Sequence, residues 1–205
     1  MQLRRISLRD WKCYAGKVEF EFPATSEGRN IYLIGAENGF GKTALYEAFV
    51  LGLFGRDGMP LLYRARFQVS GANQNDQTYS QFLSTTEEHD GVLNRPALGA
   101  GATSCSVELT FEDDAGKPIQ LQRIWHFTSK GAFKLYDEEV LVYEGVERRA
   151  VGPRSQNSSD RLDWFRDWIS KVFVPYYLGW FFMFDGEMVK TFADQGMRDQ
   201  VRNGI

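Results

Sequence analysis

Alternating apolar and polar positions open the chain. Apolar residues recur at Leu3, Ile6 and Leu8, and in VEFEF (residues 18–22) they alternate strictly with glutamates. A period of two is typical of a strand that buries one face. The pattern predicts two opening strands, joined around Ala15-Gly16, at the edge of a sheet with one solvated face.

A strand, a glycine-rich bend and a helix are predicted within Asn30–Gly55. Ile31–Ile34 is a short apolar run of the kind found in buried strands. The segment after the bend has helical spacing, with one apolar face formed by Ala44, Leu45, Ala48, Phe49 and Leu53. The next residues, 56–104, are polar and predict a variable insertion with one short helix near Tyr79–Glu88.

The period returns to two in the middle of the chain. Strands are predicted at Cys105–Phe111, Ile119–Phe127, Phe133–Tyr136 and Val140–Tyr143, with DDAGK as the first turn. These strands would form an antiparallel β meander.

Helical spacing follows the meander and ends at Pro175. Its apolar positions are Leu162, Phe165, Ile169, Val172 and Phe173. A strand is predicted at Leu178–Phe184. Residues 188–205 are charged and compatible with the start of a helix.

Composition limits the possible classes of protein. The 205 residues are 43% hydrophobic and carry a formal net charge of -3, so one folded domain is expected and no global positive field draws the chain to nucleic acid. Cys13 and Cys105 lie too far apart in the sequence for a zinc motif or a disulfide framework. The longest aromatic-apolar run, Tyr176–Phe184, is too short for a membrane helix. We therefore expect a cytoplasmic protein with no membrane partner.

The bend has the Walker A pattern that holds nucleotide phosphates. It reads AENGFGKT from Ala36 to Thr43, with alanine where the first glycine usually stands. Glycines let successive backbone N–H groups approach phosphate oxygens, and the next helix directs its positive N-terminal end at the same charge. If the Ala36 position requires a positive φ, its Cβ costs about 1 kcal/mol.

Two side chains of this motif have predicted roles of their own. Lys42 would reach the β- and γ-phosphates of ATP, and the Thr43 hydroxyl would be a ligand of Mg²⁺. The remaining predicted contacts to the nucleotide come from Ala36, Asn38, Gly39, Phe40, Gly41 and Ala44.

Four segments together resemble the SMC-like ABC ATPases of DNA maintenance, and most closely the DndD family of DNA phosphorothioation proteins. They are ISLRDWKCY at residues 6–14, GAENGFGKTALYEAFVLGLFG at 35–55, SVELTF at 106–111 and WFFMFDGEMV at 180–189. The resemblance implies an α/β fold in which residues 1–205 form the N-terminal lobe of a P-loop NTPase head. A central sheet would carry the Walker A strand, loop and helix, with the antiparallel meander beside it.

The resemblance also implies partners. Residues 188–205 would lead to a coiled coil that this chain lacks, and neither a signature motif nor a second acidic strand occurs in the sequence. A C-terminal lobe of the same ATPase, or a second copy, would complete the head. DNA and the phosphorothioation proteins DndC and DndE would be further partners. The isolated chain would bind ATP without efficient hydrolysis.

Asp185 has two interpretations. In the resembled family its position corresponds to the Q-loop, where a side chain senses Mg²⁺ and the γ-phosphate, so Asp185 would be a catalytic group and a metal ligand. Four apolar residues followed by an acid also form a Walker B pattern, with Glu187 polarising water. The second interpretation predicts a self-contained small P-loop phosphotransferase.

Other basic residues are weaker candidates. The family places a basic residue near the nucleotide at the position of Lys12, with Arg9 as the other choice. Arg123 beside Trp125 would suit a DNA backbone or a solvated strand edge. A lobe of a DNA repair ATPase, or an interaction module that does not hydrolyse ATP, remains possible from the sequence.

Overall fold

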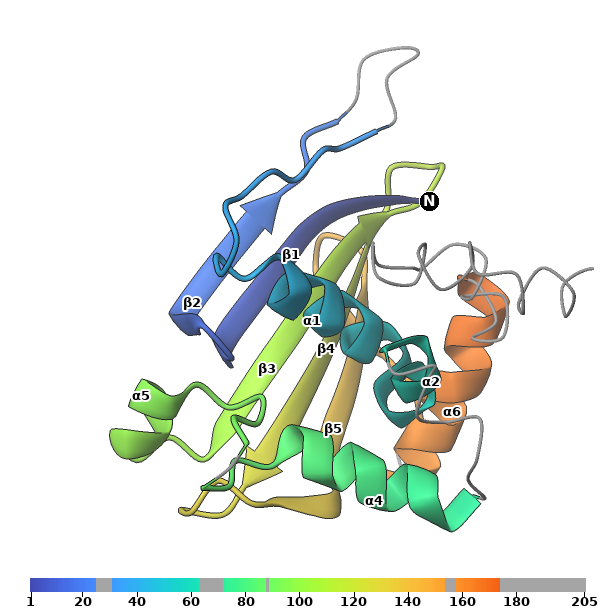
Figure 1. The fold of residues 1–205 in the computed structure, drawn as a ribbon. Coiled ribbons are helices and arrows are strands. Elements are labelled where there is room, and N and C mark those ends of the chain that lie inside the picture. Colours follow the sequence, from blue (N-terminus) through green and yellow to red (C-terminus); the bar gives the residue numbers. More distant parts are fainter. Residues whose placement is uncertain (25–30, 63–71, 88, 154–157, 174–205) are drawn as a thin grey trace, which may run out of the picture.

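The protein is built on one antiparallel six-stranded sheet with helices packed on one face. The computed structural model describes residues 1–24, 31–62, 72–87, 89–153 and 158–173. The strand order is β2-β1-β3-β4-β5-β6, and every neighbouring pair is antiparallel (Figure 1). The strands are β1 (Gln2–Trp11), β2 (Tyr14–Glu21), β3 (Ser104–Glu112), β4 (Pro118–Phe127), β5 (Phe133–Glu144) and β6 (Arg149–Val151).

The opening hairpin is present, but its turn lies earlier than predicted. β1 pairs with β2 up to Trp11 opposite Tyr14, so the turn consists of Lys12 and Cys13 rather than Ala15-Gly16. Lys12 has a φ of +48°, a left-handed conformation that a side chain rarely adopts. The contacts that hold this turn are part of the candidate site.

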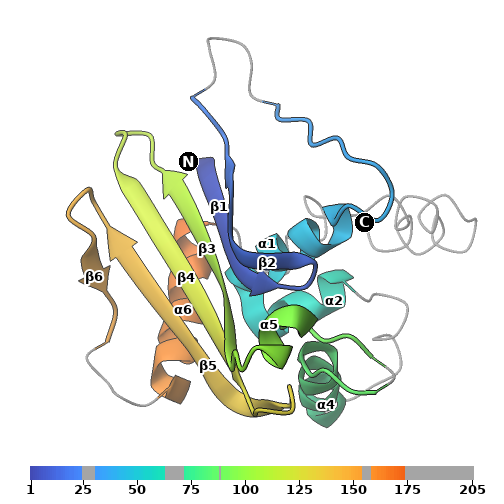
Figure 2. The same ribbon diagram turned by 90° about the vertical axis from the view of Figure 1, so that its left-hand side faces the viewer.

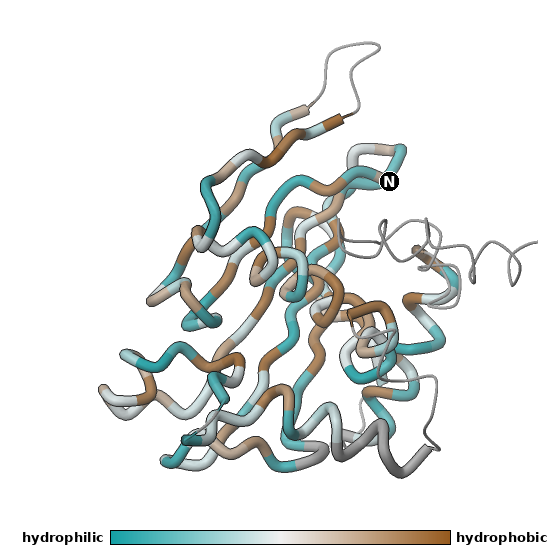
Figure 3. The backbone as a smooth tube through the Cα atoms, in the orientation of Figure 1, coloured by the Kyte–Doolittle hydropathy of each residue, from teal (hydrophilic) through white to brown (hydrophobic). Residues whose placement is uncertain are grey.

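The central strands bury one face because their apolar residues alternate. In β3 every second residue is buried, including Val107 and Leu109, and β4 has the same pattern. Helix α1 (Lys42–Phe54) crosses this face at close range: a Cβ on Gly52 would lie 3.0 Å from Val107 Cγ1. Figure 3 shows the resulting alternation of hydropathy along the strands.

The other helices cover the same face (Figure 2). They are η1 (Gly55–Gly58), α2 (Met59–Leu62), α4 (Ala72–Leu83) and α6 (Ser158–Val172), while the short α5 (Arg95–Gly99) lies near the β1–β2 turn. Phe165 and Ile169 of α6 are buried in the core, as their helical spacing predicts. Among the described residues, no helix is both long and apolar enough to cross a membrane.

The predicted meander is confirmed with one change. β3, β4 and β5 follow one another in sequence and in space. The two strands expected at Phe133–Tyr136 and Val140–Tyr143 are a single strand, β5. The polar residues between them do not end the strand, because β5 pairs with β4 across this region, with Trp125 opposite Glu138.

The strand predicted at Ile31–Ile34 is wrong in this structure. The segment has no regular secondary structure, and Ile31 and Leu33 are 87% and 95% exposed. An apolar run of this kind becomes a strand only when neighbouring strands pair with it and cover it. Among the described residues, no strand pairs with it.

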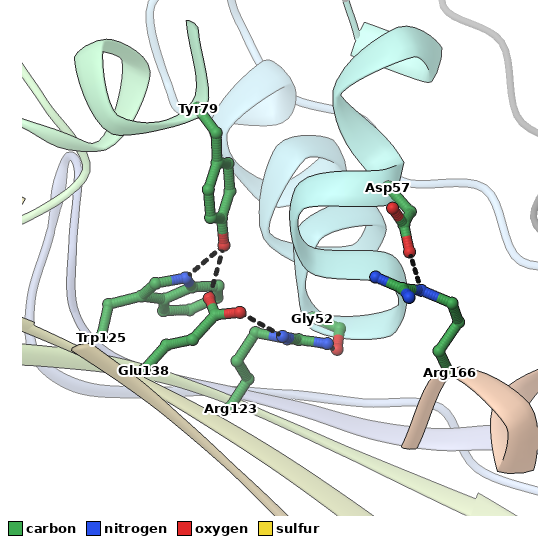
Figure 4. Close-up of polar contacts among 7 residues, drawn as sticks. All are labelled: Gly52, Asp57, Tyr79, Arg123, Trp125, Glu138 and Arg166. Atoms are coloured by element: carbon green, nitrogen blue, oxygen red, sulfur yellow. Dashed lines mark hydrogen bonds and ion pairs between the residues drawn. The ribbon is translucent and has the colours of Figure 1, made fainter. Parts of the chain in front are cut away.

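A buried polar network lies between the sheet and the helices (Figure 4). Arg123 of β4 donates from Nη1 to Glu138 Oε1 of β5 at 3.1 Å, and from Nε to the Gly52 carbonyl oxygen at 3.3 Å. The Tyr79 hydroxyl of α4 donates to Glu138 Oε2 at 2.6 Å and accepts from Trp125 Nε1 at 2.7 Å. The network joins α1, α4 and two strands.

Arg123 and Trp125 are therefore core residues, at 2% and 0% exposure. The suggestion that they contact DNA is wrong for this structure. Their positions on β4 differ by two, so both face the covered side of the sheet, and the polar atoms of each find buried partners.

Candidate nucleotide-binding site

The glycine-rich bend leads directly into helix α1. Gly39 and Gly41 have φ values of +86° and +88°, which the absence of a Cβ makes accessible. A Cβ on Gly41 would also lie 2.6 Å from the Tyr14 hydroxyl oxygen and 2.7 Å from Cys13 Sγ. Ala36 is not among the described residues with positive φ, so the expected strain at that position does not arise.

The N-terminal end of α1 is open to an anion. Gly41 is its N-cap, no side chain caps the helix, and its first turn contains no acidic residue. The first N–H groups of a helix have no partner within the helix, and they carry the positive end of its dipole. An anionic phosphate in this position would be stabilised by both.

Lys42 is directed at the loop itself. Its Nζ donates to the carbonyl oxygens of Ala36 at 2.6 Å and Glu37 at 2.8 Å, and the side chain is exposed. Two neutral carbonyl acceptors hold an ammonium group less strongly than a phosphate oxygen does. The Lys42 ammonium group is therefore placed to leave these carbonyl oxygens and bind a phosphate oxygen instead.

A depression of about 420 Å³ lies at this end of the helix. This volume is in the range of small-molecule sites. The depression contains most of the residues predicted to contact a nucleotide, but Ala36 and Phe40 do not line it, and Phe40 is 67% exposed. The lining residues are Lys12, Cys13, Asn38, Gly39, Gly41, Lys42, Thr43, Ala44 and Glu47.

The donor set fits a magnesium ion that arrives with a nucleotide. Thr43 lines the depression, and its side chain is exposed. Among the described residues, no group of three or more His, Cys, Asp or Glu side chains forms a metal cage. Mg²⁺ in phosphate sites takes one or two protein ligands and completes its shell with water and phosphate oxygens.

The β1–β2 turn forms one wall of the depression. Tyr14 donates from its hydroxyl to the Gly41 carbonyl oxygen at 3.1 Å. Burial, with a smaller contribution from Cys13, raises the pKa of the Tyr14 hydroxyl, so it remains a protonated donor. Trp11, fully buried, donates from Nε1 to the Ala44 carbonyl oxygen at 2.9 Å. These bonds fix the first turn of α1 against the hairpin.

Lys12, a predicted contact of the nucleotide, lines the depression, and it has a partner that the sequence did not predict. Its Nζ lies 2.5 Å from Glu47 Oε2, and the Glu47 side chain is only 10% exposed. Glu47 follows Thr43 by four residues on α1, and this spacing alone places both on one face of the helix. Arg9 is exposed and does not line the depression.

Asp185 and Glu187 lie outside the described residues, as do the strand predicted at Leu178–Phe184 and the helix predicted at 188–205. Both interpretations of Asp185 therefore stay predictions. The site described here consists of the loop, the N-terminal end of α1 and the β1–β2 turn.

Comparison with protein families gave one finding. A family model described as an AAA domain matches residues 5–171, which is more than half of the chain. The matched segment includes the loop, α1 and the whole sheet apart from the first residues of β1. A search of the curated proteins gave no match.

Proposed function

The chain belongs to the AAA-domain family, and from this premise we propose that it binds ATP with Mg²⁺ at the loop of residues 36–43. The match supports the SMC-like class of P-loop ATPases, and the sheet with its helices is consistent with the expected α/β P-loop NTPase lobe. The observation that carries the proposal is the combination of two positive-φ glycines, an uncapped helix end and Lys42 around one depression.

Each group of the chain has a distinct part in binding. The backbone N–H groups at the start of α1 would hold phosphate oxygens, and Lys42 would leave the Ala36 and Glu37 carbonyls to bind the β- and γ-phosphates. Thr43 would hold the metal ion. Bound Mg²⁺ supplies charge neutralisation for the phosphates.

The chain would act as one lobe of a larger head. An apolar groove of about 430 Å³ lies beside the loop and is lined in part by Tyr32, Ile34 and Phe49. Next to it, Ile31 and Leu33 are exposed. Exposed apolar residues that gather at one place on a surface are typical of an interaction site. A C-terminal lobe of the same ATPase, or a second copy, is the proposed partner for this surface.

The proposed pathway is sulfur modification of the DNA backbone in the cytoplasm. Its support is the resemblance of the four sequence segments to the DndD family, with DNA, DndC and DndE as partners. It is tested by deleting the gene in its host and digesting the DNA for mass spectrometry of phosphorothioate dinucleotides. Loss of these dinucleotides, with recovery on re-expression, is expected; unchanged levels would contradict the pathway.

The lobe proposal is tested by ATP turnover of the purified chain with Mg²⁺, with Lys42→Ala as background. We expect no turnover above that background, because the sequence contains neither a signature motif nor a second acidic strand. Turnover that disappears with Lys42→Ala would contradict the proposal and would favour Asp185 and Glu187 as a Walker B pair.

A further inference from the structure

The head group of Lys12 is held by two elements. Its Nζ lies 2.5 Å from Glu47 Oε2 on α1 and 4.6 Å from the ring centroid of Phe82 on α4. Glu47 is 8% exposed. A buried carboxylate is costly without a partner, so Lys12 is the cation that compensates it.

The backbone of Lys12 is held by a third segment, residues 92–94. Asn94 Nδ2 donates to the Lys12 carbonyl oxygen at 2.6 Å, and Lys12 N donates to the Val92 carbonyl oxygen at 2.7 Å. Asn94 N also donates to the Asp10 carbonyl oxygen at 2.9 Å. Asp10 and Lys12 both have positive φ, so these bonds hold a turn that side chains otherwise disfavour.

The Asn94 side chain makes a second hydrogen bond, and it uses a different atom for each of the two. It is 5% exposed, and its Oδ1 accepts from Ala97 N at 3.1 Å as the N-cap of α5. The amide nitrogen therefore fixes Lys12, while the amide oxygen caps the helix. A serine at this position would keep a capping acceptor, but its single, shorter hydroxyl group would not reach the Lys12 carbonyl oxygen from the capping position.

Lys12, Glu47, Lys42 and Thr43 line the same depression. We propose that Lys12 exchanges partners when a nucleotide binds, leaving Glu47 for a phosphate oxygen, and that Asn94 is the positioning residue that keeps Lys12 within reach of both. The inference rests on the proposed nucleotide binding and adds two residues, Glu47 and Asn94, that set its strength. The carboxylate competes with the phosphate for one ammonium group.

The test is a titration of the full chain with Mg²⁺-ATP, read as a dissociation constant. Lys12→Ala is expected to weaken binding about tenfold, because one charge-assisted contact to phosphate is lost. Glu47→Gln is expected to tighten binding about fivefold, the size of a single ion pair that no longer competes. Asn94→Ser is expected to weaken binding and, since a buried hydrogen bond is lost, to lower the melting temperature modestly.

Combined substitutions separate the exchange from general electrostatics. Removal of a negative charge from the depression favours any anion, with or without Lys12. If Lys12 exchanges partners, Asn94→Ser loses its effect on affinity in a Lys12→Ala background, and the effect of Glu47→Gln falls to the part that general electrostatics supplies. An effect of either that persists undiminished in that background would overturn the inference.

Two controls complete the design. Lys17→Ala removes an exposed lysine that pairs with Glu19 at 3.0 Å, away from the depression, and should leave affinity unchanged. Lys42→Ala tests the proposed function itself. Binding that requires Lys42 but is unchanged by Lys12→Ala and Glu47→Gln would refute only the exchange, whereas binding that does not require Lys42 would refute the proposed function.

Discussion

At the scale of single residues, Gly41 has the strictest requirements in the loop. Its φ of +88° excludes most side chains, and the Tyr14 hydroxyl and Cys13 Sγ occupy the place of a Cβ. Gly35, by contrast, has open space around its Cβ position and no positive φ. The two glycines therefore form a matched pair for substitution.

Gly41→Ala should lower the free energy of unfolding by about 1–2 kcal/mol, from the left-handed backbone, with a further cost from the clash. Gly35→Ala should change it by less than about 0.5 kcal/mol. Urea denaturation of both variants measures the difference. Equal stability of the two would contradict the loop geometry.

The two cysteines should differ in reactivity. Cys13 is exposed at the wall of the depression, whereas burial raises the pKa of the Cys105 thiol well above its usual value. Because the thiolate is the reactive form, N-ethylmaleimide should modify Cys13 and leave Cys105 intact in the folded protein. Peptide mass spectrometry locates the modified residue.

Bound Mg²⁺-ATP should slow the modification of Cys13, because the residue lines the proposed phosphate site. Modification at the same rate with and without nucleotide, at a concentration that saturates binding, would show that the nucleotide lies elsewhere.

The sequence predicted which loop residues lie together more completely than it predicted their surroundings. Gly39, Gly41, Lys42 and Thr43 follow from a contiguous pattern, and the structure brings them to one depression. Asn94 is 82 residues from Lys12, so no local pattern reveals their hydrogen bond. Glu47 was recognisable only by its spacing from Thr43.

At the scale of elements, helix α1 is held at its C-terminal end by the polar network of Figure 4. Its last turn contains no basic residue, and Arg123 of β4 donates to the Gly52 carbonyl oxygen in its place. A cation at this end is favourable for the helix dipole. Gly55 must lack a side chain here, since its Cβ would lie 2.6 Å from Arg123 Nη1.

Arg123→Met should lower the free energy of unfolding by about 3–5 kcal/mol, because it leaves the buried Glu138 carboxylate without its cation. Arg148→Met is the control: Arg148 pairs with Glu108 at 3.3 Å on the surface, and its loss should cost less than about 1 kcal/mol. Chemical denaturation measures both. Similar losses in the two variants would argue against a buried network.

The buried Tyr79 hydroxyl makes the stability of the protein depend on pH. Burial, followed by the nearby Glu138 charge, raises the pKa of the Tyr79 hydroxyl well above its usual 10.0. The unfolded chain ionises first as the pH rises through 10, so this contribution to stability is complete below that pH and is lost above it.

Stability should therefore fall above about pH 10, and more steeply than in Tyr79→Phe, since phenylalanine has no proton to lose. Other ionisable groups titrate in both proteins and cancel in the comparison. Parallel curves of unfolding free energy against pH would contradict the buried hydroxyl.

The sequence predicted those helices and strands whose pattern of apolar residues lies within one segment of the chain. The alternation in β3 and β4 and the helical spacing in α6 each reflect burial against the same core, whereas α1 is buried on most sides and shows no single apolar face. Ile31–Ile34 has an equally apolar pattern, but no strand among the described residues pairs with it. Strand formation depends on pairing, which a single segment cannot specify.

At the scale of the whole molecule, the sheet and its helices present the loop at one end of α1, with exposed apolar residues beside it (Figures 1 and 3). The AAA-domain match covers nearly all of this arrangement, from residue 5 to residue 171. The fold class was predictable because the Walker A pattern and the meander are both local signals. The arrangement of all the strands in one antiparallel sheet was not predictable, because β1 pairs with β3, which lies about a hundred residues later in the sequence.

The most direct test of the account is a calorimetric titration of the chain with Mg²⁺-ATP, in parallel with Lys42→Ala. We expect one saturable site per chain and a loss of affinity of at least about tenfold in the variant, because Lys42 contributes a charge-assisted contact to the phosphates. Binding of equal affinity by both proteins, or no binding by the unsubstituted chain, would contradict the assignment of the loop as a nucleotide site.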